Sequence, residues 1–257
     1  MPQTERQAAP VPARWLGRFA QTMSQDFLGG PRPLRLSTVI NLQKGGTALF
    51  VGALMLAYRN GSTEAWVYLA LHGSYGLAWL MKHLAFRDRR FDAPVTVGGA
   101  VMTVALVLGP YWLAPWLLVS GVLGPRPEAG APLLGAAIAL HTLGLAAMLG
   151  ADAQKRFQLE AGPRLLTGGM FARTRNPNYL GEMMVYGAYA LLVRHWLPWL
   201  VLAWVWGAVF VPNMLLKDAS LSRYPGWDAY RATTGLLIPR LAPAPRAAPE
   251  PAPAPPA

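Results

Sequence analysis

The sequence predicts an all-α polytopic membrane protein, and two observations support that fold class. Hydrophobic residues make up 53% of the 257-residue chain, which favours one membrane domain over two soluble domains. Several apolar runs approach the roughly 20 residues that a helix needs to cross a bilayer. We therefore expect six transmembrane helices, near residues 37–57, 65–85, 95–119, 131–150, 180–193 and 196–216.

Two of these runs are irregular. The third contains Gly109, Pro110 and Pro115. A proline inside a helix removes a backbone donor and clashes with the preceding turn, so this span is expected to be kinked or split, and a split would give seven spans. The fifth run is short, and we expect its helix to continue into the turn at Asn178.

The basic residues alternate between rich and poor connections. The N-terminal segment, the connections after the second and fourth spans and the C-terminal region each carry at least four Lys or Arg, whereas the other three connections carry one each. Because cytoplasmic loops are enriched in Lys and Arg, both termini are expected in the cytoplasm. The net charge of +11 then favours a membrane surface and anionic cofactors over nucleic acid.

The two ends of the chain differ from the membrane domain expected at 36–241. Residues 1–35 lack the apolar core of a cleavable signal peptide, and Trp15, Phe19 and Met23 recur at roughly helical spacing, which predicts an interfacial segment. The tail 242–257 is almost all Ala and Pro, a composition typical of disorder.

Metal and nucleophile chemistry find little support in the residue types present. The chain has no cysteine, which excludes disulfides, thiolate metal sites and cysteine nucleophiles. Its four histidines form no ligand pair at helical spacing, and no HExxH or GxSxG motif occurs. His141 stands alone in its span and is expected to be a packing residue. We expect no metal.

The most informative segment is 173–182, with the sequence Arg-Thr-Arg-Asn-Pro-Asn-Tyr-Leu-Gly-Glu. Asn176 can cap a helix, and Pro177 suits the first helical position. A helix N-terminus beside arginines is a ready site for phosphate. Glu182 lies about one turn further in, where an isolated carboxylate is unfavourable in a membrane. These features predict a soluble, phosphate-bearing cofactor that meets a lipophilic substrate.

Polar residues also interrupt the first two spans. Lys44, next to Gln43 in the first span, could face a water-filled cavity, pair with a carboxylate or extend to the surface. Tyr75 and Lys82 share a helical face in the second span. A buried tyrosine beside a cation can donate a proton to a developing oxyanion, and the alternative is a tyrosine that hydrogen-bonds a neighbouring helix.

Two further groups follow later spans. Asp152, Lys155 and Arg156 share one helical face and could hold a pyrophosphate and a hydroxyl group, or form an ordinary solvated helix end. Lys217 and Asp218 close the sixth span, and an aromatic-rich turn follows at 223–230. That turn is either part of the site or an interfacial anchor of Trp and Tyr.

Together these motifs resemble the steroid 5-alpha-reductase family over about residues 43–239, in particular its bacterial members. The resemblance is strongest over 168–182. A second patch is Ser74-Tyr75 followed by Arg87, Arg89 and Phe91. A third runs from Lys217-Asp218 through Tyr224, Trp227 and Tyr230, and also looks like the C-terminal signature of sterol C14 and delta-7 reductases.

The resemblance implies an NADPH-dependent oxidoreductase in lipid or steroid metabolism. It would reduce a carbon–carbon double bond conjugated to a ketone in a steroid-like or isoprenoid substrate drawn from the bilayer. Tyr75 would donate a proton to the substrate carbonyl, and Asn178 and Glu182 would hold the nicotinamide end. The other implied cofactor contacts are Arg175, Tyr179, Asp152, Lys155, Arg156, Arg87, Arg89, Lys217, Asp218, Tyr224 and Tyr230. With the basic, Ala/Pro/Arg-rich composition, the resemblance also implies a bacterial inner membrane.

One position departs from the family pattern. The helix before the catalytic tyrosine carries Gln-Glu in the steroid reductases, whereas this chain has Gln43-Lys44. A lysine can still donate a hydrogen bond to an oxyanion, but it reverses the local charge and weakens the case for a 3-oxo-4-ene steroid.

Two other functions stay open. An S-adenosylmethionine-dependent methyltransferase of the isoprenylcysteine or phospholipid type shares a basic loop, a Pro-x-Tyr turn and a late aromatic motif, but typically has Arg-His-Pro where this chain has Arg175-Asn176-Pro177. A non-catalytic lipid-binding relative is favoured by Lys44 and opposed by the presence of both Tyr75 and Glu182.

Overall fold

The structure is a computed structural model that describes residues 8–124 and 127–241. The predicted Ala/Pro tail at 242–257 lies outside these residues. In chain order the α-helices are α1 (Val11–Gln21), α2 (Leu36–Ala57), α3 (Thr63–Phe86), α4 (Val97–Thr103), α5 (Leu113–Val119), α6 (Ala131–Glu160), α7 (Pro177–Val193), α8 (Trp196–Val205), α9 (Val211–Leu221) and α10 (Trp227–Thr233).

Short π-helical and 3₁₀ turns join these helices. They are η1 (Thr22–Asp26), η2 (Arg89–Asp92), η3 (Val104–Leu108), η4 (Pro110–Trp112), η5 (Gly169–Phe171) and η6 (Trp206–Phe210). Two-residue strands, β1 (Leu34–Arg35) and β2 (Pro94–Val95), pair antiparallel. The prediction of an all-α fold is therefore confirmed, with one minimal sheet beside the bundle.

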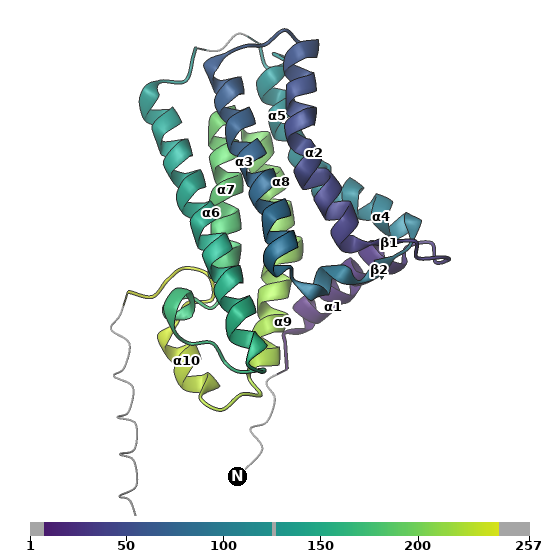
Figure 1. Cartoon of the computed structure of the whole chain (residues 1–257), viewed down its shortest axis with the longest axis vertical. Helices are drawn as coiled ribbons and strands as arrows, with labels where there is room; N and C mark the ends of the chain where they lie inside the picture. The colour runs from purple at the N-terminus through teal and green to yellow at the C-terminus, as the bar shows by residue number, and fades with distance from the viewer. Residues whose placement is uncertain (1–7, 125–126, 242–257) are drawn as a thin grey trace, which may run out of the picture.

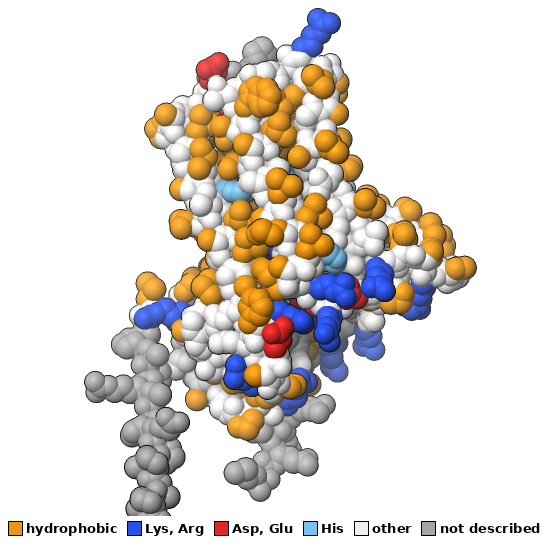
Figure 2. Space-filling model, in the orientation of Figure 1, with side chains coloured by type: hydrophobic (Ala, Val, Ile, Leu, Met, Phe, Trp, Pro, Cys, Tyr) orange, Lys and Arg blue, Asp and Glu red, His pale blue; other side chains and the backbone are white. Residues whose placement is uncertain are grey.

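The long helices run along one axis of the molecule (Figure 1). α2, α3, α6, α7 and α8 lie roughly parallel, while α1, α4 and the β1–β2 pair project to one side near the lower end and α10 lies below the bundle. Hydrophobic side chains cover the upper part of the face shown in Figure 2, and most of its Lys and Arg side chains gather at the lower end. We call this lower end the basic end.

Within the described residues, four helices or helix pairs are long and apolar enough to cross a membrane: Leu36–Ala57, Val97–Val119, Ala131–Glu160 and Trp196–Leu221. The protein is therefore a polytopic membrane protein. The other two predicted spans, α3 and α7, are helical but do not meet both criteria. α3 carries Glu64, His72 and Lys82 along its length, and α7 has only 17 residues.

The predicted interruption of the third span is confirmed. The helix that begins at Val97 loosens into the π turn η3, where the Gly109 N–H donates to the Val104 carbonyl at 2.6 Å, and then passes through η4 before α5. Pro110 has no N–H to donate, so the regular ladder cannot continue through it. The segment still counts as one span, not two.

The N-terminal segment forms an amphipathic helix, as predicted. In α1 the rings of Trp15 and Phe19 stack with centroids 5.6 Å apart, and both side chains are exposed. An interfacial position for this helix stays a prediction.

Closely packed backbones join α6 to α7. A Cβ built on Gly181 would lie 2.4 Å from the Gly144 carbonyl oxygen and 2.5 Å from the Met148 nitrogen. A Cβ on Gly144 would lie 2.6 Å from the Gly181 carbonyl oxygen. Small residues of this kind let membrane helices approach closely. The contact fixes the height of α7, and with it the position of Glu182.

This contact predicts that Gly181→Ala destabilises the protein, although Gly→Ala inside a helix ordinarily stabilises by about 0.5–1 kcal/mol. The added methyl group would meet backbone atoms, and overpacking of this kind costs about 1–3 kcal/mol. Thermal unfolding in detergent measures the effect. Gly135→Ala is the matched control, since nothing lies within 4 Å of a Cβ at that position of α6. Equal melting temperatures for the two variants would contradict the proposed contact.

Candidate functional site

Three polar side chains from three helices meet inside the bundle. The Nζ atom of Lys44 on α2 donates to Oε1 of Glu182 on α7 at 2.7 Å, and it also hydrogen-bonds the hydroxyl of Tyr75 on α3. The Tyr75 hydroxyl donates to the same Glu182 oxygen at 2.9 Å. We call these residues the Lys–Tyr–Glu triad. Of the alternatives open for Lys44, the structure shows pairing with a carboxylate.

The triad is shielded from solvent. The side chains of Lys44 and Glu182 are 4% and 18% exposed, and Tyr75 is fully buried. A charge this deep is stable only with a partner of opposite sign and further hydrogen bonds. α2 and α3 approach closely here, because a Cβ on Gly76 would lie only 2.4 Å from the Lys44 carbonyl oxygen. The absence of a side chain at Gly76 thus lets Lys44 reach Tyr75.

A tryptophan contacts both the triad and a second ion pair. The Nζ atom of Lys44 lies 3.8 Å from the ring centroid of Trp79, and the Nζ atom of Lys82 lies 4.3 Å from it. Both contacts are cation–π interactions. Lys82 in turn pairs with Asp152 on α6. The Trp79 indole N–H donates to Asn41 at 3.0 Å, which fixes the plane of the ring.

The sequence argument chose Lys82 as the cation beside Tyr75, and the structure corrects this choice. Seven residues along a helix put the two side chains on one face but about 10 Å apart along the axis. The cation that contacts the Tyr75 hydroxyl is Lys44 from the neighbouring helix. Trp79 was not singled out from the sequence, although its i+4 spacing from Tyr75 was a usable signal.

Tyrosines form the far wall of the triad. Tyr186 packs edge-on against Tyr75 with ring centroids 5.6 Å apart, and Tyr111 stacks on Tyr186 at 3.9 Å. His72 stacks on Tyr189 at 4.2 Å. Tyr186 follows Glu182 by four residues and was also missed. This wall packs aromatic rings against the Tyr75 ring, while the Tyr75 hydroxyl itself contacts Lys44 and Glu182.

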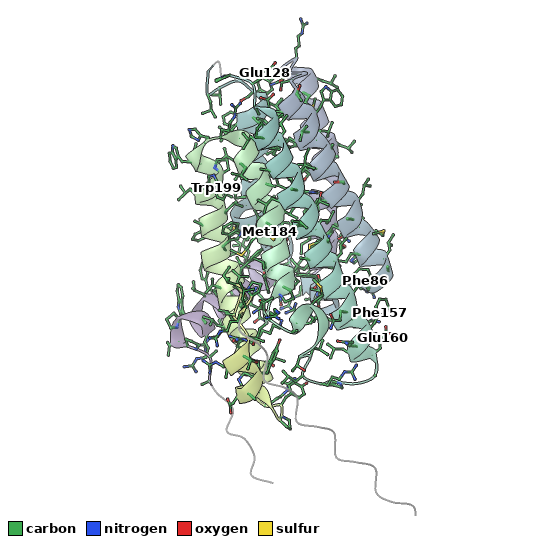
Figure 3. All side chains as sticks on the ribbon, turned by 90° about the vertical axis from the view of Figure 1, so that its left-hand side faces the viewer. Phe86, Glu128, Phe157, Glu160, Met184 and Trp199 are labelled. Carbon is green, nitrogen blue, oxygen red and sulfur yellow. The ribbon has the colours of Figure 1, made fainter. Side chains whose placement is uncertain are left out.

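At the basic end, a cleft of about 390 Å³ lies between the ends of α3 and α6. We call it the basic cleft. Figure 3 shows Phe86 and Glu160, which line it, near the lower edge of the bundle, with Phe157 beside Phe86. Five predicted cofactor contacts line the cleft together: Arg87, Arg89, Asp152, Lys155 and Arg156. Lys82, Asp88, Leu159 and Glu160 also line it.

The cleft connects to the triad through Trp79. Lys82 lines the cleft and packs on one side of the indole, and Lys44 of the triad packs against the same ring. The cleft and the triad therefore each have a lysine in contact with the same aromatic ring.

Asp88 anchors one wall of the cleft. Its carboxylate accepts hydrogen bonds from the Arg90 backbone N–H at 3.0 Å and from Lys155 at 3.1 Å. Burial raises the pKa of Asp88, but the hydrogen bonds and charge of Arg90, together with the charge of Lys155, outweigh it and hold the pKa well below its usual range. The carboxylate is therefore ionised at neutral pH and fixes the loop that carries Arg87 and Arg89.

The other predicted cofactor contacts take part in a different network. Arg175 pairs with Asp218 at 2.9 Å and donates to the Thr234 carbonyl at 2.7 Å, and Lys217 donates to the Arg175 carbonyl at 2.8 Å. The Tyr230 hydroxyl donates to the Phe171 carbonyl at 2.8 Å. These bonds fasten α10 and the segment after it onto the loop before α7. Tyr224 accepts a hydrogen bond from its neighbour Arg223 at 3.2 Å. None of the residues in this network lines the basic cleft.

The start of α7 falls at Pro177 as predicted, but the predicted side-chain cap is wrong. The Asn176 side chain makes no capping hydrogen bond. Its Nδ2 donates to the Leu236 carbonyl at 2.8 Å, and its Oδ1 accepts from Lys217 at 3.1 Å. The Asn176 side chain, which the local sequence predicts to cap α7, is instead hydrogen-bonded to the segment after α10 and to Lys217.

Two buried amide oxygens near the triad have no hydrogen-bond partner among the described residues. They are Oδ1 of Asn178, one turn before Glu182 on α7, and Oε1 of Gln43, next to Lys44 on α2. The Gln43 Nε2 donates to the Leu108 carbonyl at 3.2 Å. Tyr179 turns toward Phe210, with ring centroids 4.9 Å apart. An unpaired buried acceptor is costly, so both amides are suited to receive a donor from a ligand.

No group of three or more His, Asp or Glu side chains in the described ranges could hold a metal ion.

Fold and site together define a polytopic helical membrane protein with a buried Lys–Tyr–Glu triad beside a basic cleft. The chain belongs to the family described as protein of unknown function (DUF1295), whose model matches residues 87–224, more than half of the chain. The uncharacterized protein C7D4.09c of Schizosaccharomyces pombe (strain 972 / ATCC 24843) is 51% identical over 41 residues, which are 16% of this chain and 15% of that protein. No solved structure matches the chain.

The assignment to the steroid 5-alpha-reductase family is therefore wrong. The family that matches is DUF1295, and no match to the steroid reductases accompanies it. The motifs that suggested the assignment are short combinations of a helix start, arginines and aromatic residues. Any membrane protein with a basic surface and a helix that begins there has reason to contain them, so they do not define a family.

The triad predicts a strong dependence of stability on Lys44. Lys44→Met leaves the Glu182 carboxylate buried without its cation, and breaking a buried pair in this way costs about 3–5 kcal/mol. Adding Glu182→Gln to the same chain should recover much of the loss, because the double variant has no unpaired charge.

Thermal unfolding in detergent measures both effects. The matched control is Arg156→Met, which breaks the more exposed Arg156–Glu160 pair and should cost at most about 1 kcal/mol. Equal losses of stability for Lys44→Met and Arg156→Met would show that the buried pair contributes no more than the exposed pair.

Proposed function

We propose that the protein is a membrane-embedded, NADPH-dependent reductase of a carbon–carbon double bond conjugated to a ketone in a lipophilic substrate. The observation that carries the proposal is the Lys–Tyr–Glu triad, a tyrosine hydroxyl held by a lysine inside an apolar bundle. Such a hydroxyl suits the reduction of an enone, in which negative charge develops on the carbonyl oxygen and needs an acid.

The residues present fit the cofactor. The unpaired buried oxygen of Asn178 can accept a hydrogen bond from a carboxamide NH₂, as the nicotinamide ring carries. The basic cleft combines five Lys or Arg side chains with three carboxylates, which suits a ligand with both phosphates and hydroxyl groups. S-adenosylmethionine carries no phosphate, so the excess of basic side chains favours NADPH over that alternative.

The triad residues have separable roles in this proposal. NADPH, when bound, supplies the hydride that goes to the beta carbon of the enone. Tyr75 would turn its hydroxyl from Glu182 to the substrate carbonyl and donate a proton to that oxygen, which gives an enol. The enol would return this proton to Tyr75 as its alpha carbon takes a proton from water, which leaves the saturated ketone. Lys44 stabilises the phenolate that remains, because its ammonium group contacts that oxygen. Glu182 balances the charge of Lys44 and holds it in place.

The surroundings support a substrate from lipid and a cofactor from water. The tyrosine wall around Tyr75 is apolar, and the basic cleft lies at the end of the bundle where the basic side chains gather (Figure 2). We place this end and both termini in the cytoplasm, in line with the enrichment of Lys and Arg in cytoplasmic segments, and we propose a bacterial inner membrane as the location.

Cofactor titration is the first test of the proposal. We expect the detergent-solubilised chain to bind NADPH saturably and to give no response to S-adenosylmethionine. Asn178→Ala should weaken NADPH binding about fivefold or more, since a charge-neutral hydrogen bond is lost. Binding of S-adenosylmethionine alone would assign the protein to the methyltransferases, and an unchanged NADPH affinity in Asn178→Ala would refute the nicotinamide contact.

A substitution at Tyr75 tests the acid. Tyr75→Phe should lower kcat toward an accepted enone by about 10²–10⁴-fold, the usual contribution of a positioned acid, while leaving NADPH affinity unchanged. Tyr58→Phe is the matched control, because Tyr58 is exposed at the end of α2 away from the triad. Full turnover in Tyr75→Phe would remove Tyr75 from the mechanism.

A further inference from the structure

A second cavity of about 280 Å³ adjoins the basic cleft and shares Phe86, Arg87, Arg89 and Arg156 with it. We call it the arginine cavity. Its lining residues are His83, Leu84, Ala85, Phe86, Arg87, Arg89 and Arg156. The basic cleft mixes three carboxylates with its cations, whereas none of the described residues that line the arginine cavity is acidic. A cavity of this composition selects an anion.

The arginines of the cavity differ in whether they already form ion pairs with carboxylates. Arg87 pairs through Nε with Asp92 at 3.3 Å, and Arg156 pairs through Nε with Glu160 at 3.2 Å. Both pairs are substantially exposed and therefore weak. Arg89 has no ion pair and no side-chain hydrogen bond within the part of the chain that the structure describes. Its guanidinium group, with five donors, matches the oxygens of a phosphate.

The loop that carries these arginines is held in place before any ligand arrives. Arg87 and Arg89 flank Asp88, whose carboxylate is fixed by Arg90 and Lys155. Asp88 also caps the 3₁₀ turn η2, because its side chain accepts a hydrogen bond from the Arg90 backbone N–H. The two arginines therefore line the cavity from a short, anchored segment, and little ordering is needed for them to contact an anion.

An apolar surface leads from the arginine cavity along α3. Leu77, Met81 and Leu84 are exposed by 70%, 57% and 86%, and their i, i+4, i+7 spacing puts them on one face of the helix. α3 runs beside α6, which is long and apolar enough to span the membrane. On α6, Phe157 is also exposed and packs near Phe86. Exposed Leu and Met on a helix in this setting face lipid chains.

We propose that the arginine cavity binds the phosphate of an anionic phospholipid, with the acyl chains lying along the Leu77–Met81–Leu84 face. A basic pocket at the end of membrane helices is a known form of lipid headgroup site. A soluble phosphate compound matches the arginines equally well, but it gains nothing from Leu84, which lines the cavity and is almost fully exposed. The continuity of charge and apolar surface therefore favours a lipid.

The test uses the full chain in detergent, titrated separately with dioctanoyl phosphatidic acid, dioctanoyl phosphatidylcholine and 2′,5′-ADP. We expect phosphatidic acid to bind more tightly than phosphatidylcholine. Arg89→Ala should weaken phosphatidic acid binding about fivefold to tenfold. Arg18→Ala is the matched control: Arg18 is also exposed, but its helix α1 lines neither cavity. An equal loss of phosphatidic acid affinity in Arg89→Ala and Arg18→Ala would show that the lipid responds only to the overall positive charge, and would contradict a site at the arginine cavity.

A second variant separates lipid from soluble phosphate. Leu84→Gln changes an exposed side chain, so the fold should persist, and it should weaken phosphatidic acid binding while leaving any 2′,5′-ADP binding unchanged. If phosphatidic acid binding is unchanged in Leu84→Gln, the lipid assignment is overturned. Arg89 also lines the basic cleft, so 2′,5′-ADP binding that depends on Arg89 but not on Leu84 is the result expected of a soluble phosphate in that cleft beside a lipid in the arginine cavity. The two lipid probes contain no part of NADPH, so their result does not depend on the proposed reductase activity.

Discussion

The ion pair between Lys44 and Glu182 is the constraint on which the centre of the molecule depends. Neither charge is stable inside a helical bundle without the other, so α2 and α7 must stand at heights that bring Nζ and Oε1 together. Two close backbone contacts make this possible. Gly76 lets α3 approach the Lys44 carbonyl, and Gly181 lets α7 approach α6. Tyr75 then receives its hydrogen-bond partners from two other helices.

A second ion pair repeats this arrangement one step nearer the basic end. Lys82 and Asp152 join α3 to α6 as Lys44 and Glu182 join α2 to α7, and both lysines contact the Trp79 ring. The charged groups of the bundle thus form a path from the basic cleft to the buried hydroxyl. This path is the observation that supports the proposal of a phosphate-bearing cofactor at the surface and an acid at Tyr75.

The family finding changes what the motifs mean. Membership of DUF1295 brings no known activity with it, so function has to be argued from the site. The lysine at position 44 illustrates the difference. In the comparison with the steroid reductases, this lysine only weakened the case for a 3-oxo-4-ene steroid as substrate. In the structure it is the partner of Glu182 and the cation that contacts the Tyr75 hydroxyl.

The sequence by itself determined the helical class, the position of most helix ends, the interruption near Pro110 and the collection of Arg87, Arg89, Asp152, Lys155 and Arg156 at one end. These follow from local patterns of hydrophobicity, proline and charge. Only the tertiary structure decided which charges pair. It joined Lys44 rather than Lys82 to Tyr75, and it turned Asn176 and Arg175 toward the C-terminal segment. Helical spacing relates residues of one helix, whereas a buried ion pair is formed across helices whose relative heights are fixed by side-chain packing and close glycine contacts.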